Sequence, residues 1–207
     1  MPPPEKEESL TLEILEAIEA DSRISQRGLA RELGVALGLA NSYLKRCIRK
    51  GLVKVQEAPA NRYLYYLTPK GFAEKSRLTA EYLSYSFDFY RRAGESLRRV
   101  FDGCAANGYR RIVLAGASDL AEIALLRVRD FDLEIVALWD PEADREQFHG
   151  LPLVRELSSL PEHDLCVVSA LKDPAGLLQH LRDEGYAGAV TAPDILGLRL
   201  SPAEKGQ

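Results

Sequence analysis

The 207-residue sequence predicts a two-domain α/β protein. Three observations support this fold class. Segments with helical periodicity and a hairpin pattern fill the first third of the chain, one uninterrupted helical pattern follows them, and short apolar runs then alternate with helical segments. We therefore place the domain boundaries at 1–68, 69–108 and 109–207.

Composition is typical of a soluble globular protein, with 46% hydrophobic and 28% charged residues. No stretch approaches the roughly 18 consecutive apolar residues of a membrane span, and the first residues lack the apolar segment of a secretory signal. We therefore expect a cytoplasmic protein. Cys47, Cys104 and Cys166 are far apart, and the three histidines show no ligand spacing, so we expect no disulfide framework and no metal site.

Charge is distributed unevenly along the chain, whose net charge is −4. Residues 23–79 contain twelve Lys and Arg against three Asp and Glu, whereas residues 109–207 contain ten against seventeen. A basic block inside an acidic protein is typical of a module that binds a polyanion. A merely solvated basic face produces the same pattern.

The first third of the chain predicts three short helices followed by a hairpin. Residues 10–20 place apolar side chains on one stripe, Ser25 can cap a second helix, and Gly34 can end it before a third helix over 36–50. Two alternating runs then flank the turn-rich segment 57–61, which is the pattern of a β-hairpin. Three helices and a hairpin in this order predict a winged helix-turn-helix domain.

The third helix presents a polar, cationic face without acidic residues. Asn and Ser can hydrogen-bond base edges, Gly admits close backbone approach, and Lys and Arg suit phosphates. An ordinary solvated helix face is the alternative. Together with the start of the second helix and the hairpin tip, the predicted DNA-binding residues are Gln26, Arg27, Gly38, Asn41, Ser42, Lys45, Arg46, Arg49, Asn61 and Arg62.

Several motifs of this region resemble a known family. The segments "SQRGLARELGVALGLAN", "KGLVKV" and "LTPKG" leading to "EKSRLTAEYL" are similar to MarR-type winged-helix transcription regulators, in particular the branch associated with exopolysaccharide gene clusters. The resemblance covers residues 10 to about 90 and implies transcription regulation through double-stranded DNA. Ala36 departs from it, because that branch has a serine there to cap the recognition helix.

A long helix is predicted from Pro69 to about Cys104, since the next proline is Pro141. Apolar or small residues recur along it at alternating spacings of four and three, which is a heptad seam. The predicted dimerisation residues are Leu83, Phe87, Tyr90, Gly94, Leu97 and Phe101. A homodimer would place two recognition helices about one DNA turn apart on a palindromic site. Packing of the seam on the chain's own C-terminal domain is the alternative.

The C-terminal segment predicts a Rossmann-like parallel sheet, because apolar strands alternate with helices. In "LAGASDLAEIALL" Gly116 matches the first glycine of a dinucleotide-binding loop, Ser118 replaces the second, and Ala121 fills the third position. Asp140 ends the next predicted strand, where a ribose-binding acid is expected. These four residues are the candidate cofactor-binding residues. Helix capping by Ser118 and a turn at Asp140 are the alternative.

Two further resemblances concern this domain. The segments "VLAGASDLAEIALL", "EIVALWDPEADREQFHGLPLV" and "DLCVVSA" resemble the Rossmann domains of sugar-nucleotide enzymes, which implies a nucleotide or sugar nucleotide as a candidate effector. A winged helix followed by a Rossmann domain is similar to the NADH-sensing redox repressors, but their intact glycine loop is not present.

The sequence contains no recognisable catalytic set. The pair Tyr66 and Lys70 has the spacing used by short-chain reductases, but it spans Pro69 and so cannot lie on one helix. We therefore expect a dimeric transcription regulator and not an enzyme. The alternative is a nucleotide-dependent enzyme of sugar-nucleotide metabolism whose degenerate winged helix makes protein contacts.

Overall fold

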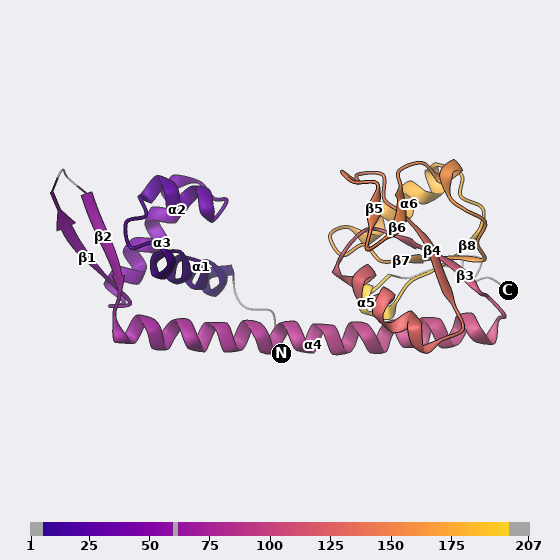
Figure 1. Cartoon of the computed structure of the whole chain (residues 1–207), viewed down its shortest axis with the longest axis horizontal. Helices are drawn as coiled ribbons and strands as arrows, with labels where there is room; N and C mark the ends of the chain where they lie inside the picture. The colour runs from indigo at the N-terminus through magenta and orange to yellow at the C-terminus, as the bar shows by residue number, and fades with distance from the viewer. Residues whose placement is uncertain (1–5, 60–61, 199–207) are drawn as a thin grey trace. The chain divides into compact units, whose positions relative to one another are not determined.

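A computed structural model of the chain describes residues 6–59 and 62–198 (Figure 1). The chain forms two compact units, and the boundary between them falls between Asp88 and Phe89. Both residues belong to one helix, α4 (Pro69–Ala106), so a single helix contributes to both units.

The N-terminal unit is a winged helix-turn-helix domain, which confirms the predicted fold. Its elements are α1 (Lys6–Ala20), α2 (Gln26–Glu32), α3 (Leu37–Arg49), β1 (Val53–Ala58) and β2 (Arg62–Leu67). The two strands pair antiparallel, with Val53 opposite Leu67. Ile14 and Leu15 of α1, Leu29 of α2, Leu44 of α3 and Tyr65 of β2 are buried together in the core of this unit.

Local hydrogen bonds define where these helices begin and end. The Gly28 N–H donates to the Ser25 hydroxyl at 3.0 Å, so Ser25 caps α2 as predicted. Gly34 has φ +62°, a backbone conformation that favours glycine and turns the chain towards α3. At the start of α4, the Gly71 N–H donates to the Thr68 hydroxyl, which itself donates to the Gly51 carbonyl at 2.7 Å. Thr68 thus ties the connection between α3 and β1 to the first turn of α4.

The long helix α4 is confirmed, but its predicted seam is divided. Leu83 and Phe87 in its first half are 46% and 60% exposed. Leu97 and Phe101 in its second half are fully buried against the strands of the C-terminal unit. Gly94 packs against Arg127 of the same unit.

The dimerisation prediction therefore needs a correction at Gly94, Leu97 and Phe101. These residues are covered by the chain's own C-terminal unit, as the alternative interpretation expected, and cannot contact a second copy. Periodicity shows that one face of a helix is buried, but it does not identify what covers that face.

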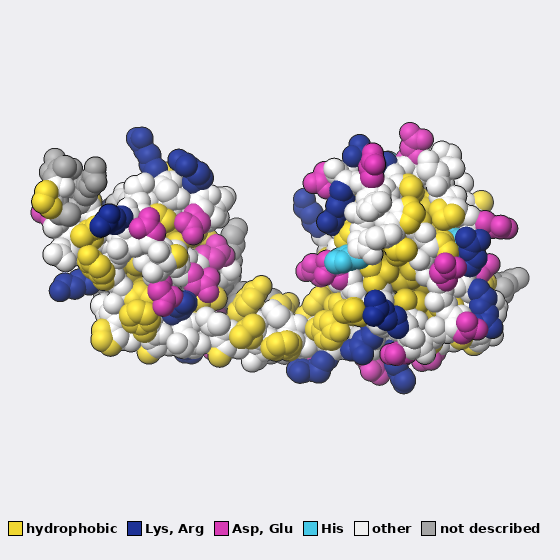
Figure 2. Space-filling model, viewed as in Figure 1, with side chains coloured by type: hydrophobic (Ala, Val, Ile, Leu, Met, Phe, Trp, Pro, Cys, Tyr) yellow, Lys and Arg dark blue, Asp and Glu magenta, His cyan; other side chains and the backbone are white. Residues whose placement is uncertain are grey.

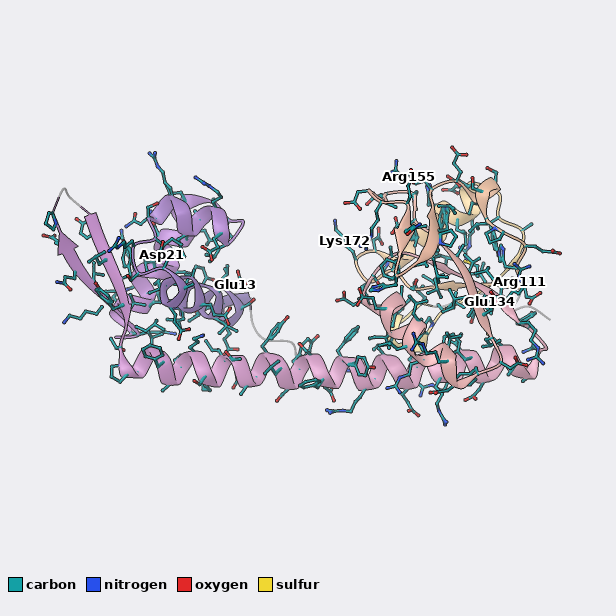
Figure 3. All side chains as sticks on the ribbon, viewed as in Figure 1. Glu13, Asp21, Arg111, Glu134, Arg155 and Lys172 are labelled. Atoms are coloured by element: carbon teal, nitrogen blue, oxygen red, sulfur yellow. The ribbon has the colours of Figure 1, made fainter. Side chains whose placement is uncertain are left out.

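The C-terminal unit is a mostly parallel α/β sheet, consistent with the predicted Rossmann-like domain. Its elements are β3 (Arg111–Ala115), α5 (Asp119–Arg127), η1 (Val128–Asp130), β4 (Glu134–Trp139), β5 (Gln147–Phe148), β6 (Leu151–Val154), η2 (Leu157–Ser159), β7 (Leu165–Val168), α6 (Pro174–Asp183), β8 (Ala189–Thr191) and η3 (Asp194–Leu196). The strand order is β5-β6-β4-β3-β7-β8, and only β5 and β6 pair antiparallel. Arg111 and Glu134 are register partners where β3 and β4 begin (Figure 3).

Both faces of this sheet are covered, as expected for parallel strands. Ile112 and Leu114 of β3 pack with α4 and α5, whereas Val113 of the same strand packs with Leu178 and Leu181 of α6. Because successive side chains of a strand point to opposite faces of the sheet, each face has its own apolar core. None of the helices in the described part of the chain has the length and apolar character needed to cross a bilayer.

Candidate nucleic-acid interface and nucleotide crevice

Helix α3 has one buried and one exposed side. Ala40, Leu44 and Cys47 are at most 2% exposed and face the domain core. The residues predicted to contact DNA from this helix lie on the other side, where Gly38, Ser42, Lys45, Arg46 and Arg49 are exposed. A Cβ built at Gly38 would meet no heavy atom within 4 Å, so packing does not require a glycine there. Figure 2 shows Lys and Arg side chains standing out from the surface of this unit.

The basic side chains of α3 differ in how they are paired. The Arg46 guanidinium lies 2.7 Å from the Glu7 carboxylate, and the Lys50 amine lies 3.9 Å from the same group. Within residues 6–59 and 62–198, Lys45 and Arg49 form no ion pair. An exposed pair such as Arg46 with Glu7 contributes only about 0–1 kcal/mol, so a phosphate can compete for Arg46.

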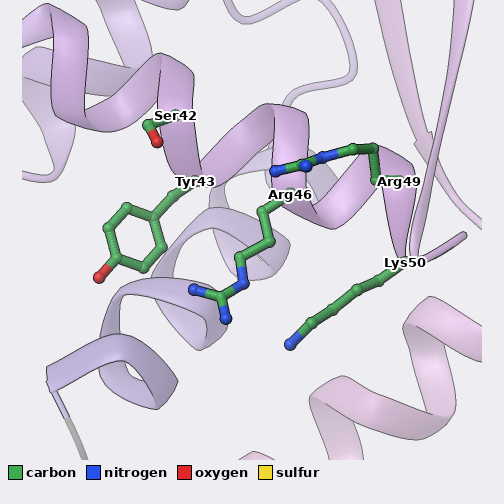
Figure 4. Close-up of a pocket in the computed structure, with 5 residues that line it drawn as sticks. All are labelled: Ser42, Tyr43, Arg46, Arg49 and Lys50. Atoms are coloured by element: carbon green, nitrogen blue, oxygen red, sulfur yellow. The ribbon is translucent and has the colours of Figure 1, made fainter.

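These cations border a concave surface. Ser42, Tyr43, Arg46, Arg49 and Lys50 line a pocket of about 540 Å³ (Figure 4). The side chains of Arg46 and Lys50 extend in the same direction there. Four of the five lining residues are polar or cationic and exposed, so the pocket suits a phosphate backbone and not an apolar ligand.

Asn41 is half-buried, and its side-chain oxygen is buried without a hydrogen-bond partner within the described residues. Leaving a buried acceptor unpaired costs about 1–3 kcal/mol, so such groups call for an explanation. Because this oxygen is closed off from solvent, the predicted base contact of Asn41 requires its side chain to rotate or to donate through its amide nitrogen.

The remaining predicted DNA contacts flank α3 in the sequence. At the start of α2, Gln26 donates to the Tyr65 hydroxyl at 3.4 Å, while Arg27 is exposed. Asn61, predicted at the wing tip, lies outside the described residues. Arg62 begins β2, and its side chain also lies outside them.

The recognition helix starts without a side-chain cap. Ala36 occupies the N-cap position with an extended backbone (φ −62°, ψ 141°) and makes no side-chain hydrogen bond. The departure from serine noted in the sequence therefore leaves an N-terminal N–H of α3 without the hydroxyl that normally satisfies it.

The C-terminal unit contains a crevice of about 700 Å³ at the carboxyl ends of its strands. The crevice is lined by Gly116 after β3, Asp140 after β4 and Lys172 after β7. Because β4 and β7 flank β3 on opposite sides, this is the topological switch point where open α/β sheets bind ligands. Ser118 also lines the crevice, whereas Ala121 lies on the buried side of α5, in the core.

Two candidate residues of this loop have structural partners. The Ser118 hydroxyl accepts the Leu120 N–H at 3.1 Å, which caps α5, and donates to the Ser169 carbonyl at 2.5 Å. A Cβ at Gly116 would lie 2.6 Å from the Ala170 nitrogen, and φ is +103° there. Glycine is thus required by the close approach of the segment after β7, whether or not a ligand binds.

Asp140 is bonded to the loop itself. Its carboxylate accepts the Ala117 N–H at 3.0 Å through Oδ2 and the Glu142 N–H at 3.0 Å through Oδ1. A pyrophosphate in a dinucleotide site would use loop N–H groups of this kind. A nucleotide here must therefore displace Asp140 from Ala117 or bind beside that pair.

Sequence reasoning missed part of the crevice lining. Arg145, Asp144, Asp173 and His180 come from the connections that follow β4 and β7 and from α6. The available signal was the position of these connections, because loops at the carboxyl ends of parallel strands converge.

A comparison with protein-family models supports the assignment of the N-terminal unit. Residues 8–54 match a model described as winged helix-turn-helix DNA-binding. This segment contains most of α1, then α2 and α3, and reaches the start of β1. The match and the observed fold agree, so the N-terminal unit is a winged helix-turn-helix DNA-binding domain.

Solved structures show more distant likenesses. MepR, a transcription regulator of the Staphylococcus aureus multidrug efflux pump MepA, is 21% identical over 41% of this chain and 62% of its own, with a TM-score of 0.36. A MarR family transcription regulator is 22% identical over 47% of this chain and 73% of its own, with a TM-score of 0.34. Human N-acetylserotonin methyltransferase in complex with SAM is 14% identical over 89% of this chain and 76% of its own, with a TM-score of 0.31. This chain thus spans less than two thirds of the length of MepR. No curated protein matches the sequence.

The uncapped start of α3 leads to a stability prediction. We expect Ala36→Ser to raise the free energy of unfolding by about 1 kcal/mol, because the new hydroxyl can accept a free N–H of the first turn. Urea denaturation followed by circular dichroism measures the change. Ser25→Ala is the matched control and should lower stability by a similar amount, because it removes the cap of α2. The prediction would be wrong if Ser25→Ala lowered the free energy of unfolding as expected while Ala36→Ser left it unchanged.

Proposed function

We propose that the chain is a dimeric transcription regulator of the MarR type that binds a palindromic operator in double-stranded DNA. In this proposal α3 enters the major groove and the β1–β2 wing contacts the duplex beside it. The observation that carries the proposal is the exposed, cationic side of α3, on which Lys45 and Arg49 have no ion-pair partner within the described residues. No Asp or Glu occurs from residue 33 to residue 56, so nothing in this segment repels a phosphate.

Exposed apolar side chains on α4 support the dimer. Tyr82, Leu83 and Phe87 are 52%, 46% and 60% exposed, and Figure 2 shows hydrophobic side chains gathered along the middle of this helix. Contiguous exposed apolar surface on a protein commonly marks an interaction site. A second copy that buries this surface would bring two α3 helices to the two halves of a palindrome.

The crevice of the C-terminal unit supports effector binding. In the proposal it holds a nucleotide or sugar nucleotide, which would act only through different affinities for two arrangements of the dimer. A sugar-nucleotide effector would suit a regulator of exopolysaccharide genes. The chain itself is not an enzyme in this proposal.

The assignment of roles on α3 leads to a prediction about DNA binding. Asn41→Ala should relax sequence preference, with a loss of about 1–3 kcal/mol of discrimination at one base position. Arg49→Gln should weaken binding to all sequences about equally and reduce the salt slope by about one. Fluorescence anisotropy with a palindromic fragment of the gene's own promoter and a scrambled duplex, at several salt concentrations, measures both.

Arg155→Gln removes an exposed cation from the C-terminal unit and is the matched control, which should bind like the wild type. Identical effects of the Asn41 and Arg49 variants would contradict the assigned roles. Absence of salt-dependent binding by the wild type would favour the enzyme with a degenerate winged helix.

The exposed surface of α4 leads to a prediction about assembly. Phe87→Asp should convert a dimer into a monomer at micromolar concentration, because it places a charge inside the proposed apolar interface. Sedimentation velocity measures the state of each variant. Leu126→Asp is the control, since Leu126 on α5 is 51% exposed and lies outside the proposed interface. A monomeric wild type, or equal dissociation by both substitutions, would exclude this interface.

The crevice leads to a prediction about effectors. At a concentration 100 times its Kd, a ligand that binds only the folded chain adds about 2.7 kcal/mol of stability. We therefore expect NADH, NADPH or a UDP-sugar to raise the melting temperature of the intact protein. Thermal melting with each compound at matched ionic strength measures the shift. Flat curves for the whole panel would contradict this prediction and favour a purely structural role for the loop after β3.

A further inference from the structure

A second pocket in the C-terminal unit is lined by three arginines. It has a volume of about 260 Å³ and lies between α4 and the segment that contains the end of α5 and η1. Arg91 and Arg98 line it from α4, and Arg127 lines it from α5. The carboxylates of Glu95 and Asp130 also line it.

The guanidinium of Arg127 is held in one orientation. Its central carbon lies 5.4 Å from the centroid of the Tyr90 ring, which is within the range of a cation–π contact. On α4 it lies against Gly94, where an added Cβ would be 2.7 Å from Nε and 2.9 Å from Nη2. Because the side chain is already ordered, a ligand would bind it with little further loss of conformational entropy.

This guanidinium has no counter-charge in the described part of the chain. Its Nε is buried without a hydrogen-bond partner, and no carboxylate lies within 4.0 Å of its nitrogens. Glu95 and Asp130 line the same pocket but do not form an ion pair with it. A partly buried cation without a counter-charge is unfavourable, so an anion in this pocket would be stabilised.

We propose that this pocket binds a compact oxyanion, the phosphate group of a small metabolite, through Arg127, Arg98 and Arg91. The planar fork of each guanidinium matches the oxygens of a phosphate and can donate two parallel hydrogen bonds. The pocket shares no residue with the crevice at the strand ends, so it is a second ligand site of the same unit. An anion held there connects α4 to the end of α5.

Isothermal titration of inorganic phosphate into the full-length protein, at constant ionic strength, tests this proposal. We expect saturable binding with a Kd on the order of 1 mM. Arg127→Gln should weaken it at least about tenfold, the loss expected when one charged hydrogen-bonding group is removed. Arg98 is exposed, so Arg98→Gln keeps the fold and provides an independent variant that should also weaken binding.

The matched control is Arg129→Gln, which removes the same charge from an exposed residue that does not line the pocket. This variant should bind phosphate like the wild type. Absence of saturable binding by the wild type would overturn the proposal. Equal weakening by Arg98→Gln and Arg129→Gln would also overturn it, because the effect would then be one of general charge and not of a site. Neither result bears on DNA binding by α3.

Discussion

The candidate DNA interface depends on the burial of one side of α3. Ala40, Leu44 and Cys47 anchor the helix in the core of the N-terminal unit, so its opposite side must face solvent. Burial raises the pKa of the Cys47 thiol to about 11, so this group stays neutral and acts as a small apolar side chain. Packing of the opposite side therefore keeps these cations in solvent, and their positions follow from the 3.6-residue period of the helix.

Helix α4 illustrates how far periodicity predicts structure. The heptad pattern correctly predicted one long helix with an apolar side, and Leu83 and Leu97 fit that pattern equally well. Their environments differ because the strands of the C-terminal unit cover Leu97 and leave Leu83 exposed. Which partner covers a helix face is a tertiary property, and no local pattern encodes it.

Local rules predicted the turns and caps well, and missed contacts between distant residues. Ser25 as a cap and Gly34 as a helix end follow from backbone chemistry within a few residues. The pairing of Arg46 with Glu7 joins α3 to α1, and the bond from Ala117 to Asp140 joins two strand ends. Both contacts change the expected role of a candidate site residue. Neither could be predicted before the elements were placed together in space.

The same contacts suggest how the two proposed ligand sites of the C-terminal unit are related. Helix α5 begins at the Ser118 cap, beside the crevice, and ends at Arg127, beside the arginine-lined pocket. A ligand that displaced Asp140 from Ala117 would disturb the loop that holds the start of α5. Because a nine-residue helix moves as a rigid element, that disturbance would reach the Arg127 guanidinium stacked on Tyr90 of α4. Coupling between the two sites then requires only that α5 have two packed positions of different affinity for each ligand.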